Sequence, residues 1–88
     1  HYYNRIDLPI SQDEKPRIIE RLVKLRIGTL ANRRIIRTSQ TDGFQFFLDD
    51  GSWLLIRFSG TEPLVRIYSE GDSIENVDSI LAEGKKLL

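Results

Sequence analysis

Apolar residues recur at helical spacing in two parts of the chain. From Asp13 onward, apolar side chains return every three or four residues with polar side chains between them. This period predicts an amphipathic helix that ends near Gly28, a residue suited to the left-handed position after a helix. The same period follows a cap at Asp72 or Ser73, with Glu75 three residues past Asp72, and predicts a second amphipathic helix. The apolar positions of the two helices are Ile18, Ile19, Leu22, Val23, Leu25, Ile74, Val77, Ile80, Leu81, Leu87 and Leu88.

The segment between the helices has the composition and period of β-strands. Apolar and polar residues alternate in its β-rich runs, so each run has one face suited to a core. The dipeptides Asp42-Gly43 and Asp50-Gly51 separate the first three runs and are typical of hairpin turns. The chain therefore predicts four consecutive antiparallel strands at residues 34–38, 44–48, 53–58 and 64–69.

The first ten residues mix aromatic and charged side chains with a proline and have no helical period. We interpret residues 1–10 as an extended lead-in segment or interdomain linker, and residues 11–88 as the folded domain. Two helices that each have one apolar face cover one face of a sheet efficiently. The predicted class is α+β: a four-stranded antiparallel sheet with two helices packed on one face.

Composition narrows the possible functions. The 88 residues suit one small domain, with 40% hydrophobic and 30% charged residues. Thirteen basic and 13 acidic residues cancel, which argues against general adhesion to nucleic acid or membrane. With no Cys and one His, thiolate chemistry is excluded and a His-rich metal site is disfavoured. The sequence has no apolar signal-peptide core and no apolar segment long enough to span a membrane, so we expect a cytoplasmic protein. Because the sequence starts at His1 and not at Met, we expect it to be a piece of a longer protein.

The ten residues 57–66, RFSGTEPLVR, carry the strongest chemical pattern. If the strands at either end are antiparallel neighbours, Arg57 and Arg66 meet at one loop mouth, where their guanidinium groups suit the oxygens of a phosphate. Ser59 and Thr61 add hydroxyl donors, and Gly60 lets backbone N–H groups approach an anion. These features predict a phosphate-binding loop, which we call the 57–66 loop. Within it, Glu62 is expected to brace the backbone and Pro63 to stiffen the exit.

Other interpretations remain open on residue types alone. Residues 59–63 are also the kinds found in ordinary turns. Arg33, Arg34 and Arg37 with Phe44, Phe46 and Phe47 suggest, more weakly, a sheet that stacks nucleic-acid bases. A purely structural or interaction module is a third hypothesis. Asp49 and Asp50 lie together in a turn, which favours a structural role over metal binding.

The 57–66 loop resembles the R-x-S-G-T-E-P-x-x-R signature of the α-D-phosphohexomutases, a family that includes phosphoglucomutases and phosphomannomutases. Every fixed position of the signature is matched. The Asp42-Gly43 turn, the lead Asp50-Gly51-Ser52-Trp53 and the run 66–70, RIYSE, also resemble the last domain of that family. The resemblance covers almost the whole chain, and ten residues with seven fixed positions are more specific than a lone glycine motif.

The resemblance implies a TATA-box-binding-protein-like C-terminal domain of a four-domain isomerase. Such an enzyme interconverts hexose 1-phosphate and hexose 6-phosphate through a 1,6-bisphosphosugar, with a phosphoserine and Mg2+ supplied by other domains. No catalytic residue and no metal ligand is expected in this chain, and the isolated domain is expected to be inactive. The implied partners are the phosphosugar and the other domains of the polypeptide, with no nucleic acid or membrane. Carried over, the residues that bind the non-reacting phosphate are Arg57, Ser59, Gly60, Thr61 and Arg66.

Overall fold

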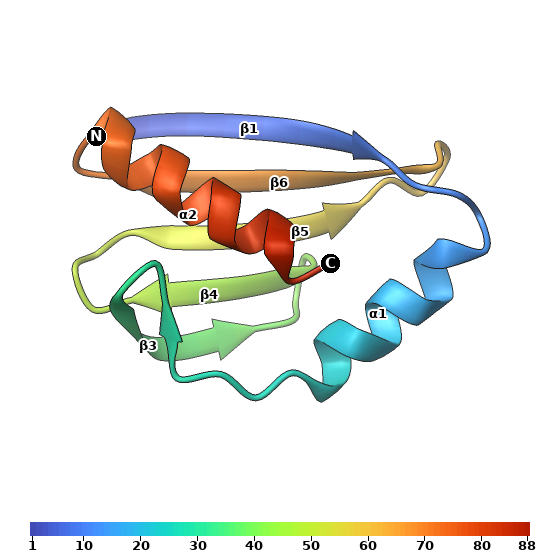
Figure 1. The fold of residues 1–88 in the computed structure, drawn as a ribbon, viewed down its shortest axis with the longest axis horizontal. Coiled ribbons are helices and arrows are strands. Elements are labelled where there is room, and N and C mark those ends of the chain that lie inside the picture. Colours follow the sequence, from blue (N-terminus) through green and yellow to red (C-terminus); the bar gives the residue numbers. More distant parts are fainter.

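The computed structural model describes all residues, His1–Leu88, and shows an α+β fold built on one antiparallel sheet. Figure 1 shows the sheet face-on, with helix α2 (Ile74–Lys86) crossing it and helix α1 (Glu14–Lys24) at its end. The strand order is β1-β6-β5-β4-β3-β2. The strands are β1 (Tyr2–Pro9), β2 (Thr29–Leu30), β3 (Arg33–Ser39), β4 (Phe44–Leu48), β5 (Trp53–Phe58) and β6 (Leu64–Gly71).

The four predicted strands form the centre of this sheet. β4 and β5 have the predicted bounds, and β3 and β6 extend slightly beyond theirs. Gly43 and Gly51 both have positive φ, at 135° and 88°, as tight turns after aspartate require. The α+β class and the central four strands are therefore confirmed, whereas the strand count of four is wrong because the sheet has six strands.

One added strand comes from the segment interpreted as a lead-in or linker. β1 pairs with β6 along its whole length, with Ile6 opposite Ile67 and Leu8 opposite Val65. Ile6 and Leu8 pack against the core, while Arg5 and Asp7, which alternate with them, are exposed. This period of two was present in the sequence. The segment is extended as expected, but it belongs to the sheet as an edge strand.

The other added strand is the short β2, which forms a hairpin with β3. Ala31 and Asn32 connect them with φ values of 51° and 63°, the left-handed pair of a two-residue hairpin turn. The first helix accordingly ends earlier than predicted, because Leu25 is already extended. Gly28 does not have a positive φ; its carbonyl instead accepts a hydrogen bond from Ile35 N–H. The predicted helix end near Gly28 is therefore wrong.

A single core lies between the sheet and the helices. Leu54, Ile56, Val65 and Ile67 have no exposed surface and face α2, whose Ile80 is equally buried. α1 contributes Ile18 and Leu22 to the same core but lies beside the ends of the strands, so α2 is the helix that crosses the sheet face (Figure 1). Neither helix is long and apolar enough to cross a lipid bilayer. The face of the sheet opposite α2 has no helix over it.

Candidate functional site

The sheet register brings Arg57 and Arg66 together at the mouth of the 57–66 loop. They are directly opposite each other in the β5–β6 pair, as the strand pattern predicted. Their chain neighbours Ile56, Val65 and Ile67 are fully buried toward α2, and alternation along a strand directs the two arginines to the uncovered face. Arg57 is exposed, and the Arg66 side chain is 33% exposed. Two guanidinium groups thus share one patch of sheet surface.

The electrostatics of this pair favour a bound anion. Like charges directly opposite on neighbouring strands destabilise a sheet. Asp7 on β1 offsets part of this charge, with its Oδ1 3.9 Å from Arg66 Nε. That Nε atom is buried and has no hydrogen-bond partner in the protein, and Arg57 joins none of the five ion pairs. An anion at the loop mouth would supply the missing acceptor and the missing negative charge.

Ser59 organises the loop from inside. Its side chain is largely buried, and its Oγ accepts hydrogen bonds from the N–H groups of Thr61 (3.4 Å) and Glu62 (3.1 Å). Its own N–H donates to the Leu64 carbonyl at 3.1 Å, which closes the loop. Because Oγ accepts at its lone pairs, the Ser59 hydroxyl hydrogen is still free to donate to a ligand. The Thr61 and Glu62 amides, in contrast, already have an acceptor.

Gly60 presents the remaining free amide of the loop turn. No hydrogen bond satisfies its N–H, and its φ is not positive. A Cβ atom built on Gly60 would meet no atom within 4 Å. The fold therefore does not require glycine at position 60. A ligand that approaches this backbone closely would require it, because a side chain would occupy the space of the ligand.

The rest of the loop is exposed and is attached to the domain through its backbone. The Pro63 carbonyl accepts a hydrogen bond from Ile10 N–H at 2.9 Å, and the Glu62 carbonyl accepts one from Leu64 N–H at 2.8 Å. The Glu62 carboxylate joins no ion pair, and Thr61 and Glu62 are exposed. Glu62 thus contributes to the loop through its main chain.

Two residues at the loop were missed from sequence. Asp7 lies beside Arg66 because β1 pairs with β6. Lys15, in the first turn of α1, donates from Nζ to the Ser59 carbonyl at 3.3 Å. Lys15 and Ser59 are 44 positions apart, so no local pattern signals the contact. For Asp7, the Ile6 and Leu8 alternation was a usable signal, since it predicts a strand that can reach the sheet edge.

The loop is one open side of a site rather than a closed pocket. The two largest grooves, of about 420 and 330 Å3, have no lining residue between 57 and 66. Their walls come from α1, the chain after it, the C-terminal residues and the ends of β1, β3 and β4. A ligand at the 57–66 loop would be enclosed only by groups from elsewhere.

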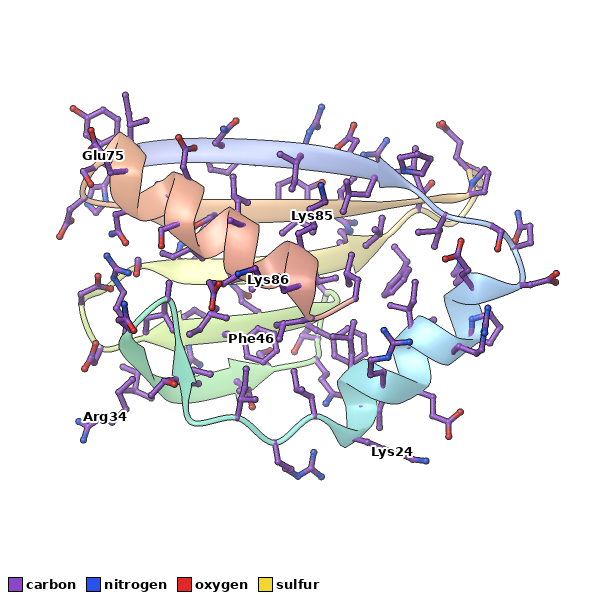
Figure 2. The ribbon with its side chains drawn as sticks, in the orientation of Figure 1. Lys24, Arg34, Phe46, Glu75, Lys85 and Lys86 are labelled. Atoms are coloured by element: carbon purple, nitrogen blue, oxygen red, sulfur yellow. The ribbon has the colours of Figure 1, made fainter.

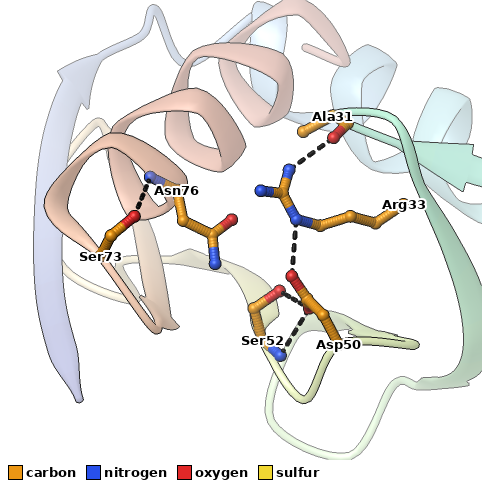
Figure 3. A network of polar contacts seen from close by, with 6 residues as sticks. All are labelled: Ala31, Arg33, Asp50, Ser52, Ser73 and Asn76. Atoms are coloured by element: carbon orange, nitrogen blue, oxygen red, sulfur yellow. Dashed lines mark hydrogen bonds and ion pairs between the residues drawn. The ribbon is translucent and has the colours of Figure 1, made fainter.

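At the opposite end of β5, a polar network joins the β2–β3 turn to the turn before β5 (Figure 3). Arg33 Nε donates to Asp50 Oδ2 at 2.6 Å, and Arg33 Nη1 donates to the Ala31 carbonyl at 2.5 Å. Asp50 Oδ1 accepts from the Ser52 N–H and hydroxyl. Burial by itself raises the pKa of Asp50, but the hydrogen bonds from Ser52 and Arg33 outweigh it and leave that pKa below its ordinary value.

This network does not suit Mg2+. The Asp50 oxygens are occupied by Arg33 and Ser52, and no three His, Cys, Asp or Glu side chains gather as a metal site would require. The residues of this chain therefore do not fit the magnesium ion that the resemblance implies for the whole enzyme.

The aromatic and basic residues of the nucleic-acid hypothesis do not share one surface. Phe46 is 7% exposed and belongs to the core, and Figure 2 shows it on β4 near the C-terminal end of α2, whereas Phe47 next to it faces the other way. Arg37 stacks on Phe47, 4.0 Å from its ring centroid, and Arg33 is engaged by Asp50. These contacts leave no continuous base-stacking platform.

Fold and site together define an α+β domain with one cationic loop at the end of an antiparallel hairpin. Residues 11–86 match the family model described as phosphoglucomutase/phosphomannomutase, C-terminal domain. The chain therefore belongs to the phosphoglucomutase/phosphomannomutase family, whose members are isomerases, and corresponds to their C-terminal domain.

Curated relatives have related names. The chain is 43% identical to a phosphoglucomutase/phosphomannomutase of Thermococcus kodakarensis, over 72% of this chain and 14% of the relative. It is 39% identical to a probable phosphoglucosamine mutase of Methanothermobacter thermautotrophicus, over 81% of this chain and 15% of the relative. It is 28% identical to a phosphopentomutase of Thermococcus kodakarensis, over 91% of this chain and 18% of the relative. The chain thus spans less than a fifth of the length of these relatives.

Proposed function

We propose that the 57–66 loop binds the phosphate group that is not being transferred, in an enzyme that interconverts hexose 1-phosphate and hexose 6-phosphate through a 1,6-bisphosphosugar. The observation that carries the proposal is the direct pairing of Arg57 with Arg66 across β5 and β6. Such a pair repels itself in the free domain and becomes favourable with a dianion between the two guanidinium groups.

Each residue of the loop has a distinct role in this proposal. Arg57 and Arg66 bind phosphate oxygens with their planar sets of N–H donors. Ser59 donates its remaining hydroxyl hydrogen, Gly60 donates its free N–H, and Thr61 adds an exposed hydroxyl. Glu62 and Pro63 support the loop through backbone hydrogen bonds at their carbonyls.

The names of the relatives favour recognition of the phosphate over recognition of the sugar. They refer to glucose, mannose, glucosamine and pentose phosphates, whose common group is the phosphate. A loop with charged and hydroxyl donors and no enclosing wall suits that common group. It also suits a bisphosphosugar that presents either of its phosphates in turn.

The remaining chemistry belongs to segments outside these 88 residues. In this proposal, other domains supply the phosphoserine, the Mg2+ and the sugar contacts, and the 57–66 loop orients the substrate and helps to exclude water. The isolated chain binds phosphate but has no mutase activity. The proposed setting of the enzyme is the cytoplasm, with the phosphosugar and the other domains as its partners.

The test is a titration of the 15N-labelled chain with inorganic phosphate and glucose 1,6-bisphosphate, followed by amide shifts. Charge-assisted hydrogen bonds of about 1.5–3 kcal/mol each place the expected Kd in the millimolar to micromolar range after binding costs. Shifts should centre on Ser59, Gly60 and Arg66. Arg57→Ala and Arg66→Ala should each weaken binding at least about tenfold.

Arg34→Ala is the matched control for these variants. Arg34 is exposed on β3 and points into solvent in Figure 2, so its removal makes the same change in net charge away from the loop. Because Arg57→Ala also removes a like-charge pair, its free energy of unfolding should be unchanged or slightly higher. Equal loss of binding in Arg34→Ala, or shifts centred away from residues 57–66, would contradict the proposal.

A further inference from the structure

Lys15 makes a contact that the loop signature does not contain. Its Nζ lies 3.3 Å from the Ser59 carbonyl oxygen, and the side chain is half-buried. Lys15 joins none of the five ion pairs, so this carbonyl is the acceptor that the protein gives its ammonium group. Lys15 therefore connects α1 to the 57–66 loop through this hydrogen bond.

The first turn of α1 is ordered so that Lys15 points at the loop. Ser11 N–H donates to Glu14 Oε1 at 2.8 Å, and Glu14 N–H donates back to Ser11 Oγ at 3.2 Å. This reciprocal pair has the hydrogen-bond pattern of a capping box and orders the turn that leads into α1, whose N-cap Asp13 makes no side-chain cap hydrogen bond. The preceding residue Ile10 is bonded through its N–H to the Pro63 carbonyl. These hydrogen bonds fix the path of residues 10–14 beside the loop, and Lys15 is the next residue in the sequence.

The Ser59 carbonyl and the Gly60 N–H belong to one peptide plane. In a trans peptide these two groups point in opposite directions, and the chain has no cis peptide bond. A donor that binds the carbonyl on the α1 side therefore orients the Gly60 N–H away from α1. The same hydrogen bond polarises the peptide and makes its N–H a better donor.

The orientation of the Ser59–Gly60 peptide matters because the Gly60 N–H is free to bind a ligand. The Thr61 and Glu62 amides are already bonded to Ser59 Oγ, whereas the Gly60 amide has no partner, and a Cβ built on Gly60 would meet no atom within 4 Å. Nothing else in the loop fixes the Ser59–Gly60 peptide plane from the side of its carbonyl.

We infer that Lys15 is a positioning residue of the phosphate site: by binding the Ser59 carbonyl, it holds the Gly60 N–H toward the phosphate. The inference rests on the proposed function of the 57–66 loop. It assigns to α1 a part in substrate binding, because a helix residue sets the direction of the one free amide in the loop. Lys15 itself does not touch the phosphate in this arrangement.

The test compares Lys15→Met with Lys24→Met in the 88-residue chain, using inorganic phosphate as the probe. Lys24 lies at the far end of the same helix and pairs with Glu20 at 2.7 Å in solvent, so its replacement makes the same change in charge and shape (Figure 2). Lys15→Met should raise the Kd for phosphate about three- to tenfold and reduce the phosphate-induced shift of the Gly60 amide. Lys15→Arg, which keeps a cationic donor, should recover much of both, and Lys24→Met should change neither.

Amide exchange separates positioning from general loosening of the loop. If Lys15 acts on one peptide plane, the exchange rates of the Thr61 and Glu62 amides stay unchanged in Lys15→Met, because Ser59 Oγ still binds them. Faster exchange at both would overturn positioning in favour of a structural role. Should Lys15→Met fold poorly, Lys15→Gln provides the same comparison.

The two proposals fail in different ways. If the wild-type chain shows no response to phosphate, both the binding function and the role of Lys15 are overturned. If the wild type binds phosphate and Lys15→Met binds it within a factor of about two, the phosphate site stands and the role of Lys15 is overturned.

Discussion

At the scale of single residues, two glycines illustrate how fold and binding place different demands on one residue type. Gly43 has a φ of 135°, and a Cβ there would lie 2.5 Å from the Ile56 carbonyl oxygen. Gly60 has neither constraint, since its φ is not positive and its surroundings are open. The turn requires Gly43, whereas a requirement for Gly60 would come from a ligand.

These two positions give a paired prediction. Gly43→Ala should lower the free energy of unfolding by at least about 1–3 kcal/mol, because the backbone conformation is strained for alanine and the added Cβ meets a main-chain atom. Gly60→Ala should leave stability unchanged or slightly higher and weaken phosphate binding severalfold. Urea unfolding and phosphate titration of both variants measure the two effects. A Gly60→Ala chain that binds phosphate normally would remove Gly60 from the site.

At the scale of elements, β1 is part of the machinery that presents the loop. It pairs with β6 along eight residues, places Asp7 beside Arg66, and leads directly into the Ile10–Pro63 hydrogen bond. The helix that follows carries Lys15 to the Ser59 carbonyl. The 57–66 loop is thus bordered by an edge strand and a helix start from the other end of the chain.

Adjacent residues of β1 distinguish a strand from a linker. Ile6→Ser should lower the free energy of unfolding by about 1–3 kcal/mol, because Ile6 packs on the core opposite Ile67. Arg5→Ser, on the uncovered side, should change it by less than about 0.5 kcal/mol. Urea unfolding of the two variants provides the comparison. Equal, negligible effects would mean that residues 1–10 are a linker in solution.

At the scale of the whole molecule, the two ends of β5 differ in how their charged residues are paired. One end leads into the 57–66 loop, and the other is held by the Arg33–Asp50–Ser52 network (Figure 3). That network joins the β2–β3 hairpin to the turn before β5, and Figure 3 shows the start of α2 beside it. At the loop end Arg57 has no ion-pair partner, whereas at the network end Arg33 and Asp50 pair with each other.

Acid should destabilise the molecule through Asp50. The pKa of Asp50 is lower in the folded chain than in an unfolded one, so the ionised form stabilises the fold above the unfolded value of about 3.9. This contribution decreases as the pH falls below about 5 and is lost once the pH passes below the folded-state pKa. Thermal unfolding between pH 7 and pH 2 should show this loss.

Two variants separate Asp50 from other carboxylates in that experiment. Asp50→Asn should lower stability at pH 7 and give a flatter dependence on pH between pH 5 and pH 2. Asp49→Asn is the matched control, because the Asp49 side chain is exposed and joins no ion pair. An Asp50→Asn chain whose acid sensitivity equals that of wild type would contradict the assignment.

The sequence by itself determined the features that depend on neighbours along the chain. Period and turn chemistry predicted the strands β3 to β6, both helices and the α+β class. The antiparallel hairpin follows from the same local signals, and with it the meeting of Arg57 and Arg66. The loop signature identified the family before the fold was known. Phosphate binding by Arg57, Ser59, Gly60, Thr61 and Arg66 stays a prediction.

Tertiary structure decided what depends on residues distant in sequence. β1 joined the sheet because Ile6 and Leu8 gain burial against β6; their alternation indicates a strand, but it does not say which strand is its partner. The first helix ended before Gly28 because residues 28–30 pair with β3. Likewise, the burial of Ser59 and its contact with Lys15 required two segments 44 residues apart to meet. Contacts between distant segments form when packing of the whole domain offsets the entropy cost of closing the chain between them. A local sequence pattern therefore does not predict them.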